Sequence, residues 1–288
     1  MRVAVDWTLS PIARFDNSIK KYKRYLQDQG LRESTMAGYI GNLERYLDYV
    51  KTDEPSAADF EAFRHHLQDL DVKRNTLNQY GYAIRAYHKM KGNEIKYKRL
   101  EPNNQLPSYF SEDDVNKIFS VINNIKHLAM LMTLFYGCLR ASELCGLNDE
   151  DLELDHFSIR VRNGKGGQDG MVFINNETAK TLRDYLRIRP SLLIDGQRPL
   201  FYTDYRRRWK REEVYRIFMI YKKNAGVKQA GGLHVFSRHT PATIMVKNGC
   251  DICIIKDILR HEDIRTTLRY THISTNTKRN NYEKYFIV

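Results

Sequence analysis

The residues best suited to chemistry are gathered near the carboxyl end of the chain, between His234 and Tyr270. Arg238 and His239 stand at the expected start of one helix, and His261 follows a second helix. An arginine binds phosphate through its fork of donors, a histidine can move a proton near neutral pH, and a tyrosine can act as a covalent nucleophile. Together these residue types suit phosphoryl transfer.

Short helices are expected to position these side chains. Thr240 and Pro241 fit the N-cap and first position of a helix that ends at Asn248-Gly249. Asp251 fits the N-cap of the helix that follows. The arginine and the late histidine would then lie at the ends of packed helices, which is a rigid way to hold polar groups in place.

A second arginine follows a nearly all-apolar run, residues 127–136, which we expect to be a buried helix. The sequence continues Gly-Cys-Leu-Arg-Ala-Ser-Glu, so that Arg140 and Glu143 are three residues apart. Burying a guanidinium is costly without a partner, and Glu143 could be that structural partner. The alternative is that Arg140 is presented to a phosphate and that Glu143 orients it.

A β-hairpin is predicted over residues 157–174. Phe157, Ile159 and Val161 alternate with polar residues, and a second short apolar run covers residues 171–174. The stretch between them is rich in glycine, as a tight turn requires. Lys165 lies at the expected tip of this hairpin, where the structural interpretation is a lysine exposed to solvent.

Two stretches of the sequence resemble the tyrosine recombinase family, which includes the phage integrases and the Xer-like site-specific recombinases. GCLRASELCGL at 137–147 resembles the family's first arginine box, and SRHTPAT with the later LRH and TTLRYTH resembles its carboxy-terminal signature. The resemblance implies that Tyr270 attacks a DNA phosphodiester, forms a 3′-phosphotyrosyl bond and releases a 5′-hydroxyl. It also implies that Arg140 and Arg238 stabilise the charge on the phosphate oxygens, with support from His261.

Further roles follow only from this resemblance. Lys165 corresponds to the family lysine that protonates the leaving 5′-oxygen. The base that acts on the tyrosine is expected to be His234 or His261. Glu143 would orient the first arginine, and His239 is the neighbour of the second arginine in the signature.

The sequence departs from the family pattern at four places. His234 precedes Arg238 by four residues where the family has three, so either the backbone bulges by one residue or the role of this histidine is vacant. Arg260 stands in place of the glycine in the family's Leu-Gly-His. Pro241 and the hairpin turn, with its Gln-Asp at 168–169, are the other two departures. None of them replaces an expected arginine or the expected tyrosine, so we expect an active enzyme.

The composition favours a polyanionic partner. Lys and Arg number 47 against 35 Asp and Glu, the formal net charge is +12 and the pI is near 9.4. Such a balance favours nucleic acid over an anionic membrane surface. No stretch reaches the ~20 apolar residues of a membrane span, and the amino-terminal residues lack the apolar core of a signal peptide. We therefore expect a cytoplasmic, DNA-associated protein.

Neither a metal nor a cofactor is expected. Four cysteines without a secretion signal fit a reducing cytoplasm. Cys250 and Cys253 form a C-x-x-C, but a second pair with zinc-ligand spacing is lacking, so we expect both to be buried apolar residues. A covalent phosphotyrosine would conserve the energy of the phosphodiester, so ATP is not needed, and the sequence has no phosphate-binding glycine loop.

The first part of the chain has helical periodicity throughout, with apolar and aromatic residues at three- and four-residue steps. A stretch with two prolines and two asparagines then marks a linker. We expect a mainly α protein with a small β-hairpin: a helical domain over 1–98, a linker over 99–110 and a mixed α/β catalytic domain over 111–288. The resemblance implies that the first is the family's SAM-like core-binding domain, which closes over one side of a DNA duplex.

Two basic groups are expected to contact the DNA backbone. The first, in the last helix of the helical domain and just before it, consists of Lys73, Arg74, Arg85 and Lys89. The second, in a run with Tyr and Trp that is expected to open a helix, consists of Arg206, Arg207 and Arg208. The alternatives are a solvated charged face for the first group and an ordinary charged helix start for the second.

The sequence therefore predicts a site-specific DNA recombinase that acts on double-stranded target sites. By analogy with the family, monomers or dimers in solution would assemble as a tetramer on DNA, and the tail over 275–288 would pack into a neighbouring protomer. Integration, excision and multimer resolution are all compatible with the sequence. A type IB topoisomerase-like relaxing enzyme and a catalytically silent DNA-binding relative are the alternatives.

Overall fold

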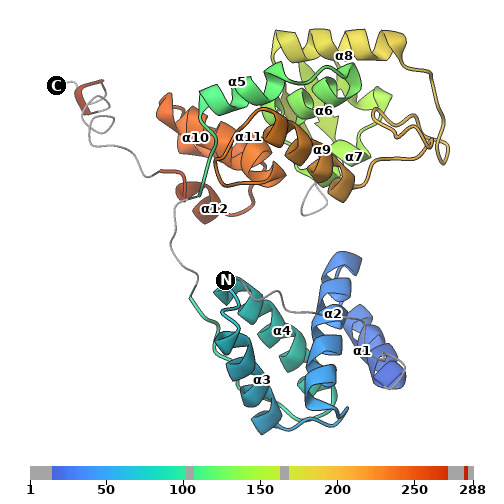
Figure 1. The fold of residues 1–288 in the computed structure, drawn as a ribbon, viewed down its shortest axis with the longest axis vertical. Helices are drawn as coiled ribbons and strands as arrows, with labels where there is room; N and C mark the ends of the chain where they lie inside the picture. Colours follow the sequence, from blue (N-terminus) through green and yellow to red (C-terminus); the bar gives the residue numbers. More distant parts are fainter. Residues whose placement is uncertain (1–14, 102–106, 163–168, 272–281, 285–288) are drawn as a thin grey trace. The chain divides into compact units, whose positions relative to one another are not determined.

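The computed structural model describes residues 15–101, 107–162, 169–271 and 282–284. The chain divides into two compact units, residues 1–104 and 105–288 (Figure 1). This boundary falls inside the stretch that the sequence marks as a linker. Each unit has a hydrophobic core of its own.

The described part of the first unit contains four helices: α1 (Asp16–Asp28), α2 (Glu33–Val50), α3 (Ala57–Asp69) and α4 (Arg74–Met90). The core is rich in tyrosine, and buried hydroxyls have partners. Tyr22 donates to the carbonyl of Ala83 at 2.7 Å, and the hydroxyl of Tyr46 is 3.1 Å from Nε2 of His88. The phenol rings therefore contribute apolar area without leaving a buried polar group unpaired.

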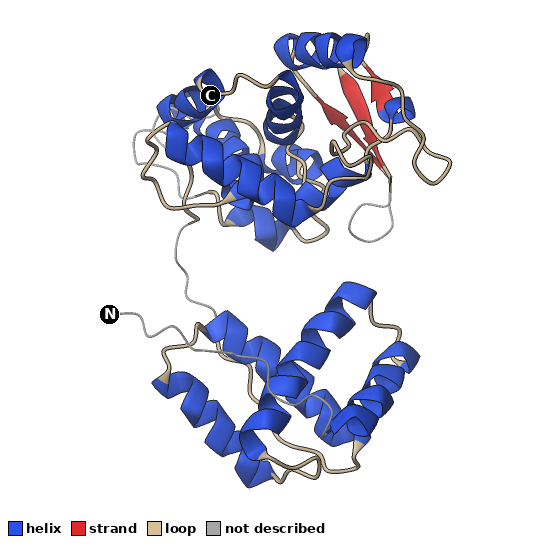
Figure 2. Cartoon of the chain, turned by 45° about the vertical axis from the view of Figure 1, so that its right-hand side comes forward, coloured by secondary structure: helices blue, strands red, loops and turns tan. Residues whose placement is uncertain are grey.

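The second unit is a helical assembly with a small sheet at one edge (Figure 2). Its described helices are α5 (Glu112–Ser120), α6 (Ile125–Tyr136), α7 (Ala141–Gly146), α8 (Asn176–Ile188), α9 (Arg211–Asn224), α10 (Thr240–Lys247), α11 (Ile252–Ile258) and α12 (Ile264–Leu268). Helix α6 is the expected apolar helix, and all its residues from 129 to 135 are buried. It lies against α8 on one side and leads directly toward the arginine box on α7.

The sheet has three antiparallel strands in the order β1-β2-β3: β1 (Leu152–Glu153), β2 (Ser158–Val161) and β3 (Gly170–Phe173). Strands β2 and β3 form the predicted hairpin, with Ile159 opposite Val172. Strand β1 was not predicted, because two residues are too few to show a period. The turn that carries Lys165 lies outside the described residues. The prediction of a mainly α protein with a small sheet is confirmed.

Three local predictions are wrong. Thr240 is not the N-cap of α10, because the chain enters that helix from a π-helical turn, η3 (Val235–His239), in which His239 is already helical. The run from Tyr205 to Lys210 does not open a helix, since α9 begins at Arg211. Cys253 is exposed rather than buried. The prediction that Asp251 caps α11 is confirmed, because its side chain accepts from the amide of Cys253.

Neither a membrane-spanning helix nor a metal cluster occurs in the described part of the chain. None of the helices described there is long and apolar enough to cross a bilayer. In the same residues no cluster of three or more His, Cys, Asp or Glu side chains could hold a metal ion.

Candidate active site

Arg238 lies at the centre of the candidate site and is buried, with 1 % of its surface exposed. Its guanidinium donates from Nη1 to the carbonyl of Cys138 at 2.6 Å and from Nη2 to the carbonyl of Leu259. These carbonyls belong to the C-terminal ends of α6 and α11, where the helix dipole is negative. Burial and the nearby guanidiniums of Arg140 and Arg260 lower the pKa of Arg238 to about 10, so it stays charged at neutral pH.

Both helix ends close with a residue in the left-handed conformation. Cys138, after α6, has a φ of 48°, and Arg260, after α11, has a φ of 51°. At the end of α11 the amides of Arg260 and His261 donate to the carbonyls of Asp257 and Lys256 at 2.9 and 3.0 Å, which is the Schellman pattern. Glycine usually takes this position, and a side chain there costs roughly 1 kcal/mol of backbone strain. Arg260 occupies the position at which the family pattern has glycine.

Glu143 links two of the arginines. Its Oε1 accepts from Nη1 of Arg140 at 2.6 Å, and its Oε2 accepts from Nη2 of Arg260 at 2.6 Å. Burial raises the pKa of this carboxyl, but the guanidiniums of Arg260 and Arg140 outweigh burial and hold the pKa of Glu143 below its usual value. Glu143 is thus a structural partner of Arg140 and also fixes its orientation. One carboxylate among the guanidiniums of Arg140, Arg238 and Arg260 leaves the cluster positively charged.

The backbone explains the spacing of His234 and Arg238. A π-helical turn over Val235–His239 contains more residues than an α-helical turn. This turn is the one-residue bulge that was one of the two alternatives for the spacing. The ring of His234 lies 4.9 Å from the ring of His239 and is perpendicular to it, at 89°. Partial desolvation and the charges of Arg238 and Arg140 lower the pKa of His234.

Tyr270 is buried, with 7 % of its surface exposed, in a small core that α10 and α11 share. Its hydroxyl lies 2.8 Å from Nδ1 of His239, and the two rings are 5.5 Å apart. The sequence did not predict this contact, since it assigned the base to His234 or His261. Burial raises the pKa of Tyr270, while the charges of Arg238 and Arg269 act in the opposite direction.

His261 follows the end of α11, two residues after Leu259, whose carbonyl binds Arg238. Its Nδ1 lies 2.8 Å from Oγ1 of Thr267, a buried residue of α12. The hydroxyl therefore fixes the late histidine beside the end of α11. Lys165, the expected general acid, lies outside the described residues.

The basic group of the first unit is exposed. Its members, on α4 or just before it, are Lys73, Arg74, Arg85 and Lys89. Residues 85 and 89 lie about three and four helical turns after residue 74, so all three lie along one side of α4. This exposure and alignment are compatible with a surface that follows a DNA backbone.

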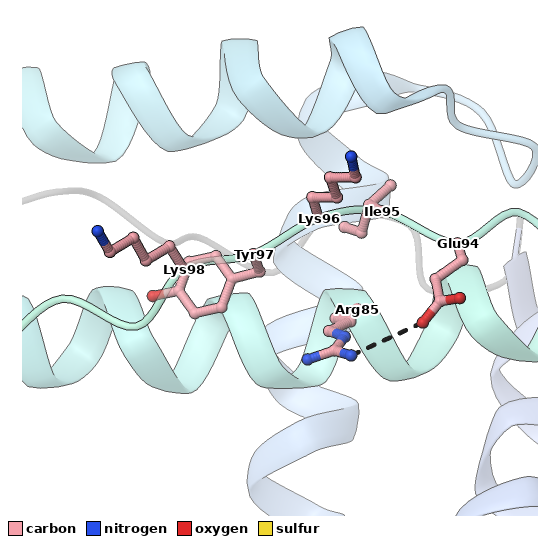
Figure 3. A pocket seen from close by; sticks show the side chains of 6 residues that line it. All are labelled: Arg85, Glu94, Ile95, Lys96, Tyr97 and Lys98. Carbon is pink, nitrogen blue, oxygen red and sulfur yellow. Dashed lines mark ion pairs between the residues drawn. The ribbon is translucent and has the colours of Figure 1, made fainter.

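A surface hollow adjoins this stripe, between α4 and the segment after it (Figure 3). It is lined by Arg85, Glu94, Ile95, Lys96, Tyr97 and Lys98. Nη2 of Arg85 is 3.7 Å from Oε1 of Glu94, so this carboxylate offsets part of the positive charge. Three cations against one carboxylate still leave the hollow basic.

The second basic group is mostly engaged inside its own unit. Arg207 donates to the two carboxylate oxygens of Glu213 at 2.8 and 2.5 Å. Arg208 donates to the carbonyl of Leu147 at 3.2 Å and to Oε1 of Gln197 at 2.8 Å. Both contacts are structural, which favours the alternative to DNA binding for these two residues. Arg206 is exposed, whereas Arg207 and Arg208 are half-buried.

Comparison with known proteins extends this picture from the site to the whole chain. The sequence model of the phage integrase family matches residues 108–277, which is more than half of the chain. The chain belongs to the phage integrase family. The predicted membership of the tyrosine recombinase family, which includes the phage integrases, is therefore confirmed.

Relatives of this integrase-family chain are similar along almost their whole length. The tyrosine recombinase XerA of Pyrococcus horikoshii is 30 % identical over 272 residues, which cover 92 % of each chain. The tyrosine recombinase XerD of Oceanobacillus iheyensis is 27 % identical and covers 93 % of this chain and 97 % of its own.

Solved structures of the family share the fold. The XerA recombinase structure matches with a TM-score of 0.56 and 25 % identity, and the match covers 95 % of this chain and 99 % of that chain. The Tn1549 transposon integrase in complex with transposon right end DNA matches with a TM-score of 0.71 and 19 % identity, covering 94 % and 99 %. At that identity, the second match supports the fold alone.

Proposed function

We propose that this integrase-family protein is a site-specific DNA recombinase, which cuts and rejoins duplex DNA through a 3′-phosphotyrosyl bond on Tyr270. The observation that carries the proposal is the convergence of Tyr270, Arg238, Arg140 and two histidines in one positive cluster. The π turn η3 supplies Arg238 and His239, the start of α7 supplies Arg140, and Tyr270 follows α12. Such a cluster suits the attack of a phenol on a phosphodiester. The relatives that match over almost their full length are named tyrosine recombinases.

The arginines are suited to bind the non-bridging phosphate oxygens. Arg238 commits one N–H of each Nη to a carbonyl, and its buried Nε has no hydrogen-bond partner among the described residues. A guanidinium has five N–H donors, so Arg238 keeps donors for a phosphate while the two carbonyls hold it in place. Donors fixed in this way stabilise the charge that develops in the transition state, and each is worth on the order of 10²–10³ in rate.

The leaving 5′-oxygen needs a proton, which we assign to Lys165 on the β2–β3 hairpin. The base of that hairpin contacts the arginine cluster: a Cβ on Gly170 would come within 2.7 Å of Cδ of Arg260. The described end of the hairpin at Gly170 therefore lies beside the arginine cluster, which supports this hairpin as the source of the acid.

Double-stranded DNA is the substrate in this proposal, and its site of action is the cytoplasm. The exposed cations of α4 and the adjoining basic hollow would contact the backbone of one duplex. Arg206 would add a contact from the second unit. Contacts of this kind position a protein on DNA without reading its sequence.

We further propose a tetramer on paired target sites, in which the tail over 275–288 packs into a neighbouring protomer. The support is the apolar Tyr-Phe-Ile-Val sequence that ends the tail, together with the tyrosine recombinase family membership. Deleting residues 277–288 should prevent assembly on DNA, measured by native electrophoresis and analytical ultracentrifugation. Unchanged assembly and activity would rule out this role for the tail.

Covalent trapping tests the function. The native target site is first identified by selecting the genomic fragments that the protein binds. The substrate is then a suicide duplex that carries this site. Wild type should give a denaturation-resistant adduct, Tyr270→Phe should give none, and Tyr282→Phe serves as a control for a late tyrosine outside the site. An adduct that survives in Tyr270→Phe would make another tyrosine the nucleophile. Tight binding without any adduct would support the silent DNA-binding alternative instead.

A further inference from the structure

We propose that His239, rather than His234 or His261, is the general base that takes the proton from the hydroxyl of Tyr270. This inference rests on the proposed function, in which Tyr270 is the nucleophile. Its basis is the 2.8 Å contact between the Tyr270 hydroxyl and Nδ1 of His239, which is a hydrogen-bond distance before any substrate arrives.

The position of His239 is fixed from several sides. The residue ends the π-helical turn, and its carbonyl accepts from Oγ1 of Thr243 at 2.8 Å. Its ring packs against the ring of Tyr270 on one side and is met edge-on by the ring of His234 on another. The π turn thus serves a second purpose, since it places Arg238 in the buried cluster and the very next side chain against the nucleophile.

The other two histidines are placed for other tasks. Nδ1 of His261 is hydrogen-bonded to Thr267, which commits that nitrogen to a contact with α12. His234 packs edge-on against the ring of His239, whereas Nδ1 of His239 is the nitrogen at hydrogen-bond distance from the phenol. We assign His234 to support His239 and the phosphate, and His261 to the end of α11 beside Arg238.

The charges around His239 keep its ring neutral in the free protein. Besides Tyr270, the titratable or charged groups facing it are His234, Arg238 and Arg269. Burial, followed by His234, Arg269 and Arg238, lowers the pKa of His239 to about 4, so at neutral pH its Nδ1 can accept a proton. A phosphodiester bound by the arginines adds negative charge, which raises the pKa of His239 toward the range in which proton transfer is efficient.

The phenol proton moves to the histidine as the new bond to phosphorus forms. Neutral His239 carries its proton on Nε2 and accepts the phenol proton on Nδ1 while the Tyr270 oxygen forms a bond to phosphorus. The bond between phosphorus and the 5′-oxygen breaks, its electron pair stays on that oxygen, and the general acid supplies a proton there. In religation the 5′-hydroxyl returns its proton to the conjugate base of the general acid and its oxygen forms a bond to phosphorus. The bond between phosphorus and the Tyr270 oxygen breaks, and Nδ1–H of the imidazolium gives its proton to that oxygen.

The test is the single-turnover rate of adduct formation on the suicide duplex, measured from pH 5.5 to 9. His239→Ala removes the base, and His239→Asn keeps a polar atom near the position of Nδ1 but cannot take up the proton. The matched control is His127→Ala, because Nδ1 of His127 also lies 2.9 Å from a tyrosine hydroxyl, that of Tyr221, in the same unit. Melting temperature and DNA binding are measured for every variant.

Both His239 variants should form the adduct on the order of 10²–10⁴-fold more slowly at neutral pH. Their rate should keep rising with pH where the wild-type rate levels off, and imidazole should partly restore His239→Ala. His127→Ala should keep the wild-type pH profile whatever its melting temperature.

Three results would overturn the inference. The first is a wild-type rate in His239→Ala, and the second is a slow rate with the wild-type pH profile and no imidazole rescue, which would make His239 a positioning residue. The third is full activity in His239→Asn. Failure of the proposed function is distinguishable from all three, because wild type itself would then give no adduct that depends on Tyr270.

Discussion

Nη2 of Arg260 lies 2.6 Å from Oε2 of Glu143, although 117 positions separate these residues in the chain. The pair connects the end of α11 to the start of α7, and through Glu143 it also fixes Arg140. Arg260 has a left-handed backbone conformation, which favours glycine and is strained for arginine. The strained residue is found where its side chain forms an ion pair in the active-site cluster.

Arg260→Gly should therefore separate stability from activity. The glycine relieves roughly 1 kcal/mol of backbone strain, which offsets much of the missing ion pair, so the free energy of unfolding should change by about 1 kcal/mol or less. Adduct formation should slow on the order of 10-fold, because Arg140 loses part of its support. Chemical denaturation and covalent trapping measure the two effects.

Glu143→Gln provides the control for this explanation. If Arg260 acts through Glu143, the double variant Arg260→Gly/Glu143→Gln should form the adduct no more slowly than Glu143→Gln alone. Such non-additive effects are the signature of coupled residues. Independent, multiplicative losses would mean that Arg260 contacts the substrate directly.

Arg238→Lys should be costly although it keeps the positive charge. One ammonium cannot reproduce the planar fork that reaches the carbonyls of Cys138 and Leu259. One buried carbonyl would lose its partner, at a cost of about 1–3 kcal/mol in the free energy of unfolding. Adduct formation should fall on the order of 10²–10³-fold. A lysine variant with wild-type stability would contradict the helix-end explanation of this buried cation.

Patterns that repeat within one element could be predicted from the sequence. The N-cap role of Asp251 was visible because the cap stands next to the helix that it opens, and the structure confirms it. The apolar run of α6 and the alternating residues of β2 were equally local. The helical period of the first unit was predictable for the same reason.

The geometry of the site could not be predicted in this way. The contact between Tyr270 and His239 spans 31 positions, and that between Arg238 and Cys138 spans 100. Both depend on how helix ends meet, which no periodicity encodes. A backbone bulge was predicted only as one of two explanations for the spacing of His234 and Arg238. Arg260 was recognised as a departure from the family pattern, but its ion pair with Glu143 was not predicted.

The exposed stripe on α4 should determine part of the salt dependence of DNA binding. Replacing Arg74, Arg85 and Lys89 with glutamine should reduce the slope of log Kobs against log salt by about 0.9 for each phosphate that the protein no longer neutralises, or by roughly 2–3 in total. The measurement is fluorescence anisotropy on a random-sequence duplex from low to moderate salt. Arg207→Gln is the matched control, because Arg207 is paired with Glu213, and it should leave the slope unchanged. Equal slopes for the triple variant and wild type would exclude α4 from the interface.

The DNA-free protein should lose stability when the pH falls from about 6.5 toward 4, and His239 should account for part of this loss. Its pKa is lowered from 6.5 to about 4 in the folded chain, so within this window the unfolded chain binds a proton that the folded chain does not. The free energy of unfolding therefore rises with pH across the window and levels off above it. A shift of this size corresponds to roughly 3 kcal/mol. Urea denaturation at several pH values, compared with His239→Asn, isolates the contribution, since carboxyl groups titrate alike in both proteins. A stability difference between the two proteins that does not change with pH would mean that His239 is not held neutral by its surroundings.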